Sequence, residues 1–448
     1  MESISDLNTV TQEDRTLNDP ENNYGFDTLA IHAGQEPDSS TLSRAVPVYR
    51  TSSFVFKDSE HAANLFGLKE PGNIYSRIMN PTSDVLEKRM AALEGGVGAL
   101  ALASGSAAVF DSVINIIEHG YELLASRHLY GGTFTLFQDI LPQFGIKTRF
   151  VDCGDAEAFA NSVNSKTRAI FVEAIGNPEL CVPDFLEVKK VAQEAHIPLI
   201  VDSTFTTPYL FKPIEFGADV VVHSLTKWIG GHGTAIGGIV VDAGKFDWTD
   251  PKFRLFNEPE LSYHGLRFAH DLGEMAPMAY ILRMRLVPLR NMGACASPDN
   301  TWLFLQGLET LSLRMERHCS NSLAVAKFLE KHPKVAWVKY PGLESDPSFP
   351  KTQKYFRRGL AGGVVVFGIA GGTNSAKKFI GALRLFSHLA NVGDAKSLVI
   401  HPASTTHSQL SKEQRLLAGI PDEMIRLSIG IEEEQDILND LDNALRGV

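Results

Sequence analysis

Between Pro81 and Val241, short apolar runs alternate with stretches of helical periodicity. The apolar runs predict strands over residues 98–103, 121–125, 147–151, 169–173, 197–202, 218–223 and 236–241. The periodic stretches predict helices over residues 81–96, 107–118, 133–144 and 185–195. Strands that alternate with helices through short loops are typical of a mostly parallel central sheet with helices on both faces. We therefore expect an α/β fold.

The first of these helices carries recognisable start and stop signals. Thr82 and Ser83 are the N-cap candidates, and the helical pattern runs into Gly95 and Gly96. The stretch therefore predicts a helix with a well-defined beginning and end.

The segments before the alternation have a different character. Residues 1–23 are polar enough to predict a disordered tail. Residues 28–79 read as an extended arm, with 45–56 (AVPVYRTSSFVF) as its one strand-like piece. Because such an arm has little core of its own, we expect it to lie on another surface, such as that of a second subunit.

The second half predicts an insertion and a smaller domain. Residues 243–298 interrupt the alternation, and Arg283, Arg285 and Arg290 within them are interpreted as a solvated helix face. Helical periodicity over 300–331 is long enough to bridge two domains. Further segments predict a C-terminal α+β domain: strands over 336–340 and 363–367, a helix over 375–382, and strands near Leu398 and Arg426. The predicted parts are a tail and arm over 1–79, a large domain over 80–306 and a C-terminal domain over 307–448.

Composition excludes several classes of function. A formal net charge of −11 over 448 residues argues against a nucleic-acid or membrane surface. The N-terminus lacks the order of a signal peptide, and no apolar run reaches membrane-spanning length, so we expect a cytoplasmic protein. The four cysteines are far apart without a CxxC pair, so we expect reduced thiols and neither a disulfide framework nor a zinc site. They are Cys153, Cys181, Cys295 and Cys319.

The segment 220–238, VVVHSLTKWIGGHGTAIGG, is the strongest candidate for chemistry. Its one lysine, Lys227, follows a predicted strand and precedes a glycine-rich loop, and a buried lysine there could be neutral and nucleophilic. Asp202 ends another predicted strand, and parallel strands bring such residues to one sheet edge. A lysine that forms a Schiff base and an acid against the ring nitrogen are what pyridoxal phosphate requires. Read singly, Lys227 could be a surface lysine and Asp202 a helix cap.

A phosphate group would need hydrogen-bond donors near Lys227. Gly105 and Ser106 open a predicted helix, so their backbone N–H groups and the helix dipole favour a dianion. The Ser224 and Thr226 hydroxyls could add donors. A single SGS turn is a weak signal, because most such turns are only caps.

Seven motifs together carry a family resemblance. SGSAA, LYGGT, EAIGNPEL, VDSTFTTP, HSLTKWIGGHG, HPASTTH and RLSIGIE occur in the order seen in the cysteine and methionine metabolism family of pyridoxal-phosphate enzymes, the group of cystathionine γ-synthase and methionine γ-lyase. The resemblance runs from about Thr28 to the C-terminus. It implies a fold-type I transferase with pyridoxal 5'-phosphate as cofactor.

The resemblance also implies a role for each matching residue around the cofactor. Lys227 matches the lysine that holds the cofactor covalently, and Asp202 matches the partner of its pyridine nitrogen. Tyr130 matches the tyrosine that stacks on the ring and assists proton transfer, although alone it would read as a core aromatic. Asn177 matches the amide that bonds the phenolic oxygen of the ring, although alone it would read as a turn residue.

Other matching residues imply a shared site. Tyr75 and Arg77 match residues that reach the cofactor phosphate and substrate in the neighbouring subunit, and an arginine fork suits a phosphate. Arg426 matches the arginine that binds the substrate α-carboxylate. Read alone, Arg77 would be a surface arginine and Arg426 an ion-pair partner. The family is usually a homotetramer, built as a dimer of dimers.

Within the family, the chain most resembles the O-acetylhomoserine sulfhydrylases. Asn391 stands where the lyases and cystathionine γ-synthase more often have Ser, Gly132 stands where methionine γ-lyase has Cys, and the 243–298 insertion also fits that subgroup. The implied reaction is γ-replacement, in which O-acetyl-L-homoserine and sulfide or methanethiol give L-homocysteine or methionine. The alternatives are a methionine γ-lyase type of carbon–sulfur lyase, an O-succinylhomoserine sulfhydrylase and a cystathionine γ-synthase. An inactive homologue is disfavoured because Lys227 and Asp202 are both present. His401 and His407 have no metal-ligand spacing, so we expect no metal.

Overall fold

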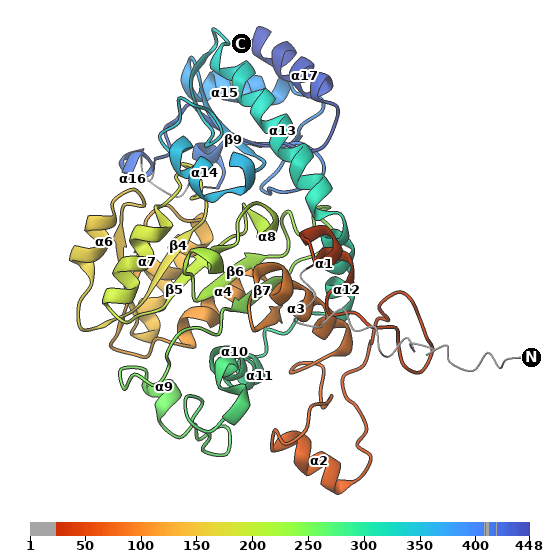
Figure 1. The fold of residues 1–448 in the computed structure, drawn as a ribbon. Helices are drawn as coiled ribbons and strands as arrows, with labels where there is room; N and C mark the ends of the chain where they lie inside the picture. The colour runs from red at the N-terminus through yellow and green to blue at the C-terminus, as the bar shows by residue number, and fades with distance from the viewer. Residues whose placement is uncertain (1–23, 407, 409–411, 418) are drawn as a thin grey trace, which may run out of the picture.

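The computed structural model describes residues 24–406, 408, 412–417 and 419–448 (Figure 1). A central sheet with flanking helices forms the main body, and a second, smaller sheet lies at one end near the C-terminus. The predicted disordered tail over residues 1–23 lies outside the described residues. Among the described residues, no helix is long and apolar enough to cross a membrane.

The central sheet has seven strands in the order β1-β7-β6-β5-β4-β2-β3. β2 to β6 pair in parallel, while β7 is antiparallel to both β1 and β6. This arrangement confirms the predicted mostly parallel sheet. The strands are β1 Gly98–Leu102, β2 Glu122–Ser126, β3 Lys147–Val151, β4 Thr167–Glu173, β5 Leu199–Asp202, β6 Val220–Ser224 and β7 Gly238–Asp242.

Helices connect the strands and cover the sheet (Figure 1). Among them are α3 Pro81–Glu94, α4 Gly105–Ile114, α6 Ala156–Ser162, α7 Phe185–Glu194 and α8 Thr207–Leu210. The cap of α3 differs from the predicted one, because the Asn80 side chain accepts the Thr82 N–H at 3.0 Å and Pro81 occupies the first helical position. Gly95 ends the helix with φ of +80°, as the sequence predicted for a glycine there.

The predicted helix over 133–144 is divided into three pieces. α5 covers Gly131–Thr135, a π-helical turn η2 covers Leu136–Ile140, and a 3-10 turn η3 covers Leu141–Phe144. Pro142 lacks the N–H that a regular helix would use at this point, and Gly145 ends the segment with φ of +75°. A single α-helix over this stretch was therefore wrong.

The N-terminal arm contains α1 Phe26–His32 and α2 Ser59–Phe66. In Figure 1 the segment that carries α2 projects away from the body. Residues 45–56 form no strand, apart from an isolated bridge between Ser53 and Tyr75. The strand predicted there was wrong, because pairing with residues 74–76 is limited to this bridge and its two flanking backbone hydrogen bonds.

The 243–298 segment folds into short helical pieces: α9 Arg254–Asn257, η5 Gly273–Met278, α10 Ala279–Met284, η6 Arg285–Leu289 and α11 Arg290–Met292. The predicted solvated arginine face was wrong for Arg283 and Arg285, whereas Arg290 is partly exposed. Arg283 is buried and donates to the backbone oxygens of Leu255 and Asn115, while Arg285 pairs with Glu87. These arginines are structural because they satisfy buried acceptors.

The C-terminal part begins with two helices, α12 Pro298–Glu309 and α13 Leu311–Glu330, separated at Thr310. They replace the single helix predicted over 300–331. A five-stranded sheet follows, in the order β10-β11-β12-β9-β8, and its core is distinct from that of the large sheet. The elements of this part are β8 Val335–Lys339, α14 Phe349–Tyr355, η7 Arg357–Gly359, β9 Val364–Ile369, α15 Gly372–Ala382, β10 Ser387–His388, β11 Leu398–Ile400, η8 Pro402–Ser404, α16 Lys412–Leu417, β12 Met424–Ser428 and α17 Glu434–Arg446. In the large domain, the 3-10 turn η4 Pro213–Phe216 connects α8 to β6.

Candidate active site

Lys227 lies in the loop that follows β6. Its N–H donates to the Ser224 carbonyl at 3.3 Å, and its carbonyl accepts the Gly231 N–H at 2.7 Å, so the loop is tightly turned. The Lys227 Nζ donates to Asn391 Oδ1 at 2.6 Å. Burial, and then the nearby Arg426 charge, lower the pKa of Lys227 to about 8. The amine is therefore much closer to its neutral, nucleophilic form than an exposed lysine.

Asp202 ends β5 on the same sheet edge. Its Oδ1 accepts the Thr204 N–H at 2.9 Å, and burial raises the pKa of the carboxyl group above its ordinary value. A cationic ring nitrogen beside Asp202 would offset this burial cost. Thr204 also accepts the Ser224 N–H at 2.8 Å, so it links the Asp202 strand to the loop that carries Lys227.

The predicted phosphate donors surround the start of α4. Gly105 and Ser106 occupy its first turn, after the N-cap Ser104, where backbone N–H groups have no partner within the helix. A Cβ atom at Gly105 would lie 2.6 Å from Ser224 Cβ, so only glycine allows this close approach. The helix start and Ser224 therefore form one cradle suited to a dianion. The Thr226 hydroxyl instead bonds the Gly237 backbone, accepting its N–H at 3.1 Å.

Tyr130, Asn177 and Arg426 come from three further segments. The Tyr130 side chain is 53% exposed, and its N–H donates to Glu173 Oε1 at 2.6 Å. Asn177 is buried, and its Oδ1 accepts from Arg426 Nη1 at 3.2 Å. Arg426 lies on β12 of the small sheet, and burial lowers its pKa to about 10. The small sheet therefore reaches the edge of the large one.

Two residues of this site were missed from the sequence: Glu173 and Thr204. Glu173 ends β4 and is the register partner of Asp202. A polar residue at the end of an apolar run was the signal used for Asp202, and the same signal marked Glu173 in EAIGNPEL. Thr204 carries no comparable signal, because its role depends on a hydrogen bond between two loops.

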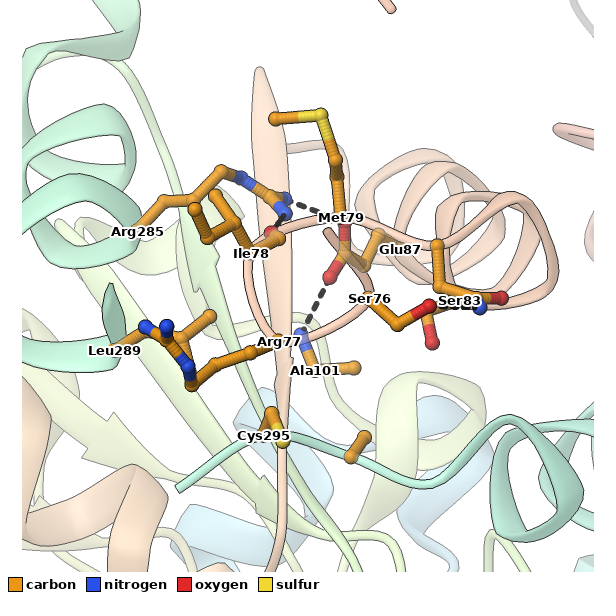
Figure 2. A pocket seen from close by; sticks show the side chains of 12 residues that line it. Ser76, Arg77, Ile78, Met79, Ser83, Glu87, Ala101, Arg285, Leu289 and Cys295 are labelled. Atoms are coloured by element: carbon orange, nitrogen blue, oxygen red, sulfur yellow. Dashed lines mark hydrogen bonds and ion pairs between the residues drawn. The ribbon is translucent and has the colours of Figure 1, made fainter. Parts of the chain in front are cut away.

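Tyr75 and Arg77 contact each other, and Arg77 also contacts the 243–298 segment. The Arg77 guanidinium stacks 5.3 Å from the centre of the Tyr75 ring and also donates to the Arg290 carbonyl. Figure 2 shows Arg77 in a hollow with Arg285, Glu87 and other residues of α3, β1 and the insertion. None of the residues grouped around Lys227 lines this hollow.

A family model for Cys/Met metabolism PLP-dependent enzymes matches residues 27–446. The chain belongs to this family. The Cys/Met metabolism enzymes use pyridoxal 5'-phosphate (PLP) as cofactor.

Named relatives and a solved structure agree with the family assignment. An O-acetyl-L-homoserine sulfhydrylase of Leptospira meyeri is 54% identical, over 95% of this chain and 98% of its own. A homocysteine synthase of Schizosaccharomyces pombe is 52% identical, over 94% of this chain and 98% of its own. A solved Campylobacter jejuni structure of a candidate O-acetylhomoserine (thiol)-lyase, with pyridoxyl phosphate on a lysine, superposes with a TM-score of 0.90 at 40% identity, over 94% of this chain and all of its own.

The geometry around Lys227 fits PLP, the cofactor of this family. The cradle at Gly105 and Ser224 suits its phosphate, the partly buried Asp202 carboxyl group suits its ring nitrogen, and Lys227 would supply the amine. The Tyr130 ring is half-exposed at the same sheet edge. Among the described residues, no cluster of three or more His, Cys, Asp and Glu could hold a metal ion. His401 bonds Ser404 and the Asp422 carbonyl, and His407 lies outside the described residues.

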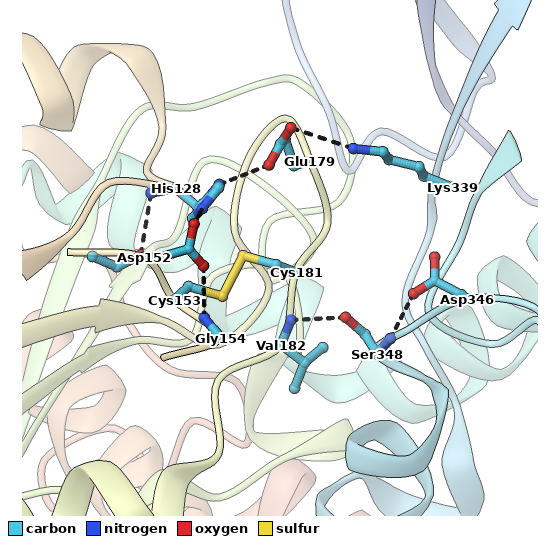
Figure 3. Close-up of a disulfide and its surroundings, with 11 residues drawn as sticks. His128, Asp152, Cys153, Gly154, Glu179, Cys181, Val182, Lys339, Asp346 and Ser348 are labelled. Carbon is cyan, nitrogen blue, oxygen red and sulfur yellow. Dashed lines mark hydrogen bonds and ion pairs between the residues drawn. A yellow bond between two sulfur atoms is a disulfide. The ribbon is translucent and has the colours of Figure 1, made fainter. Parts of the chain in front are cut away.

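One expectation about the cysteines was wrong. Cys153 and Cys181, 28 residues apart in sequence, form a disulfide (Figure 3). Cys295 and Cys319 are free. The loops that follow β3 and β4 bring the two sulfur atoms together, which sequence spacing does not reveal. Beside the disulfide, the His128 ring lies between the Asp152 and Glu179 carboxylates. Glu179 also forms an ion pair with Lys339 of the small sheet.

Proposed function

We propose that the protein catalyses γ-replacement on O-acetyl-L-homoserine. The bond between Cγ and the ester oxygen breaks, the sulfur of hydrosulfide forms a new bond to Cγ, and the products are L-homocysteine and acetate. Methanethiol in place of hydrosulfide would give methionine. The observation that carries the proposal is the Lys227–Asn391 hydrogen bond of 2.6 Å, because it brings the reactive amine to the residue that suggested the sulfhydrylase subgroup. The names of the relatives at 54% and 52% identity support the same reaction.

The chain's own residues would divide the work as follows. Bound PLP draws electron density from the substrate carbon that carries the amino group. Arg426 binds the substrate α-carboxylate, and Lys227, with its pKa lowered to about 8, accepts and returns protons at Cα and Cβ. Tyr130 covers one face of the ring and assists proton transfer. Asp202 holds the charge beside the ring nitrogen.

The remaining site residues would hold the cofactor and substrate in place. Gly105, Ser106, Ser224 and Thr226 hold the phosphate, although the Thr226 hydroxyl would have to share its bond with Gly237. Asn177 bonds the phenolic oxygen of the ring. Asn391 orients the Lys227 amine and contacts substrate.

We infer that the active enzyme is a homotetramer, a dimer of dimers in which Tyr75 and Arg77 complete the neighbouring subunit's site. Two observations support this assembly. Tyr75 is 41% exposed and its ring contacts the Arg77 guanidinium, and the projecting arm carries exposed Val55, Phe56 and Phe66. The cytoplasm is the compartment that suits such a biosynthetic enzyme.

A steady-state comparison of four substrates tests the reaction. With sulfide present, O-acetyl-L-homoserine is expected to give homocysteine with a higher kcat/KM than O-succinylhomoserine or O-acetylserine. Methionine alone is expected to give little 2-oxobutyrate and ammonia. Rapid 2-oxobutyrate formation from methionine would overturn the assignment in favour of a γ-lyase, and a preference for the succinyl ester would replace the proposed substrate.

A further inference from the structure

Glu173 is a buried carboxylate at the sheet edge that carries Asp202. It is 7% exposed and ends β4, where it is the register partner of Asp202 on β5. Side chains of register partners in neighbouring parallel strands project from the same face of a sheet. The two carboxyl groups therefore lie on one face.

The Glu173 side chain joins two loops that present residues to the cofactor. Its Oε1 accepts the Tyr130 N–H at 2.6 Å, and the Asn177 backbone N–H is near enough to the carboxyl group to lower its pKa. Tyr130 follows β2, whereas Asn177 follows β4. One buried side chain thus fixes the backbone of both residues.

We propose that Glu173 is a positioning residue, which sets Tyr130 beside the PLP ring through this backbone hydrogen bond and steadies Asn177 through its nearby backbone N–H. The proposal rests on the cofactor site assigned above and is independent of the choice of substrate. Glu173 itself touches neither substrate nor the reacting atoms.

Electrostatics agree with this role. Burial, and then the Asp202 charge, raise the pKa of Glu173 well above its ordinary value. Two neighbouring carboxyl groups in a buried site cannot both ionise cheaply. Burial and the Asp202 charge therefore both disfavour a negative charge on Glu173.

Three variants of the PLP-loaded enzyme test the role. Glu173→Gln has a side chain of the same length with an acceptor oxygen for the Tyr130 N–H, so its cofactor affinity and the visible circular dichroism of the bound cofactor are expected to match wild type. Glu173→Asp withdraws the carboxyl group by one methylene, and Glu173→Ala removes it. Both are expected to weaken cofactor binding about tenfold, as the loss of a buried hydrogen bond predicts, and to reduce the circular dichroism signal.

Asp242→Ala is the matched control. Asp242 is also buried and accepts two backbone N–H groups, those of Gly244 at 2.8 Å and Ile281 at 3.2 Å, but it pairs with Val220 at the opposite edge of the large sheet. Asp242→Ala is expected to lower the unfolding temperature without changing the cofactor signal. Wild-type cofactor binding in Glu173→Asp, or a Glu173→Gln variant as impaired as Glu173→Asp, would overturn the proposal even if Glu173→Ala did not fold. An incorrect substrate would leave all these readouts unchanged.

Discussion

The Lys227 Nζ donates to Asn391 Oδ1 at 2.6 Å, although the two residues are 164 positions apart. Lys227 follows a strand of the large sheet, and Asn391 lies between β10 and β11 of the small one. Residues from both sheets therefore position the reactive amine.

Replacing Asn391 by Ala is expected to lower kcat/KM for O-acetyl-L-homoserine by about tenfold, because a buried hydrogen bond is worth about 1.4 kcal/mol in such comparisons. The amine would lose the acceptor that orients it. Steady-state kinetics measure the effect, with Asn439→Ala as a control on α17. Equal losses in both variants would contradict a local role for Asn391.

Gly105→Ala is expected to weaken PLP binding by about tenfold or more, since the strain of overpacking is about 1–3 kcal/mol. The new Cβ atom would lie 2.6 Å from Ser224 Cβ, which would push the start of α4 away from the phosphate cradle. Cofactor titration followed by absorbance measures the change. Gly381→Ala is the matched control, because a Cβ atom on this residue of α15 meets nothing within 4 Å. The site assignment would fail if both variants bound PLP like wild type.

Mixed oligomers test the shared site. Arg77→Ala and Lys227→Ala subunits are each expected to be inactive alone. Co-refolded, they are expected to recover activity, because one of the two sites in a mixed dimer would contain both native residues. Absence of recovery in oligomers shown by mass spectrometry to be mixed would argue against a site built from two chains.

Cofactor-free protein is expected to gain stability as pH rises through the range set by Lys227. Burial lowers the pKa of this lysine to about 8 from 10.5, so the unfolded chain binds more protons between these values. The cost of charging Lys227, at most about 3 kcal/mol, is present below pH 8 and disappears above pH 10.5. Lys227→Met should therefore be more stable than wild type at pH 7, with a smaller difference at pH 10.

Urea unfolding of both proteins at the two pH values measures this change. Lys245→Met is the control, because Lys245 is exposed in the loop after β7. Equal pH dependence of the Lys227→Met and wild-type proteins would contradict the assigned pKa shift.

Periodicity in the sequence predicted the large sheet well because its strands are apolar runs with clear ends. β3, for example, spans the predicted residues Lys147–Val151. Sequence periodicity failed as a predictor where contacts between distant segments decide whether a residue is paired or buried. The run over 45–56 has strand-like composition but no partner strand, and Arg283 is buried because distant backbone oxygens accept its hydrogen bonds.

Some residues of the candidate site could likewise be predicted from the sequence, and others could not. Lys227 and Asp202 could be chosen from strand ends alone, whereas the family resemblance was needed to suggest Tyr130, Asn177 and Arg426. The structure brings these five residues to one edge. Glu173 and Thr204 were missed because their contribution is a hydrogen bond to another loop. The assignment of Tyr75 and Arg77 to a second subunit, and the domain boundaries at 79/80 and 306/307, stay predictions.

The hydrogen bond between Asn177 and Arg426 joins residues 249 positions apart, and Arg426 lies close to the C-terminus. During translation the large sheet can therefore be synthesised completely while this contact is still missing. Only after β12 has left the ribosome can the site close. Capture of the cofactor in its final geometry would thus follow the synthesis of β12, after that of the large sheet.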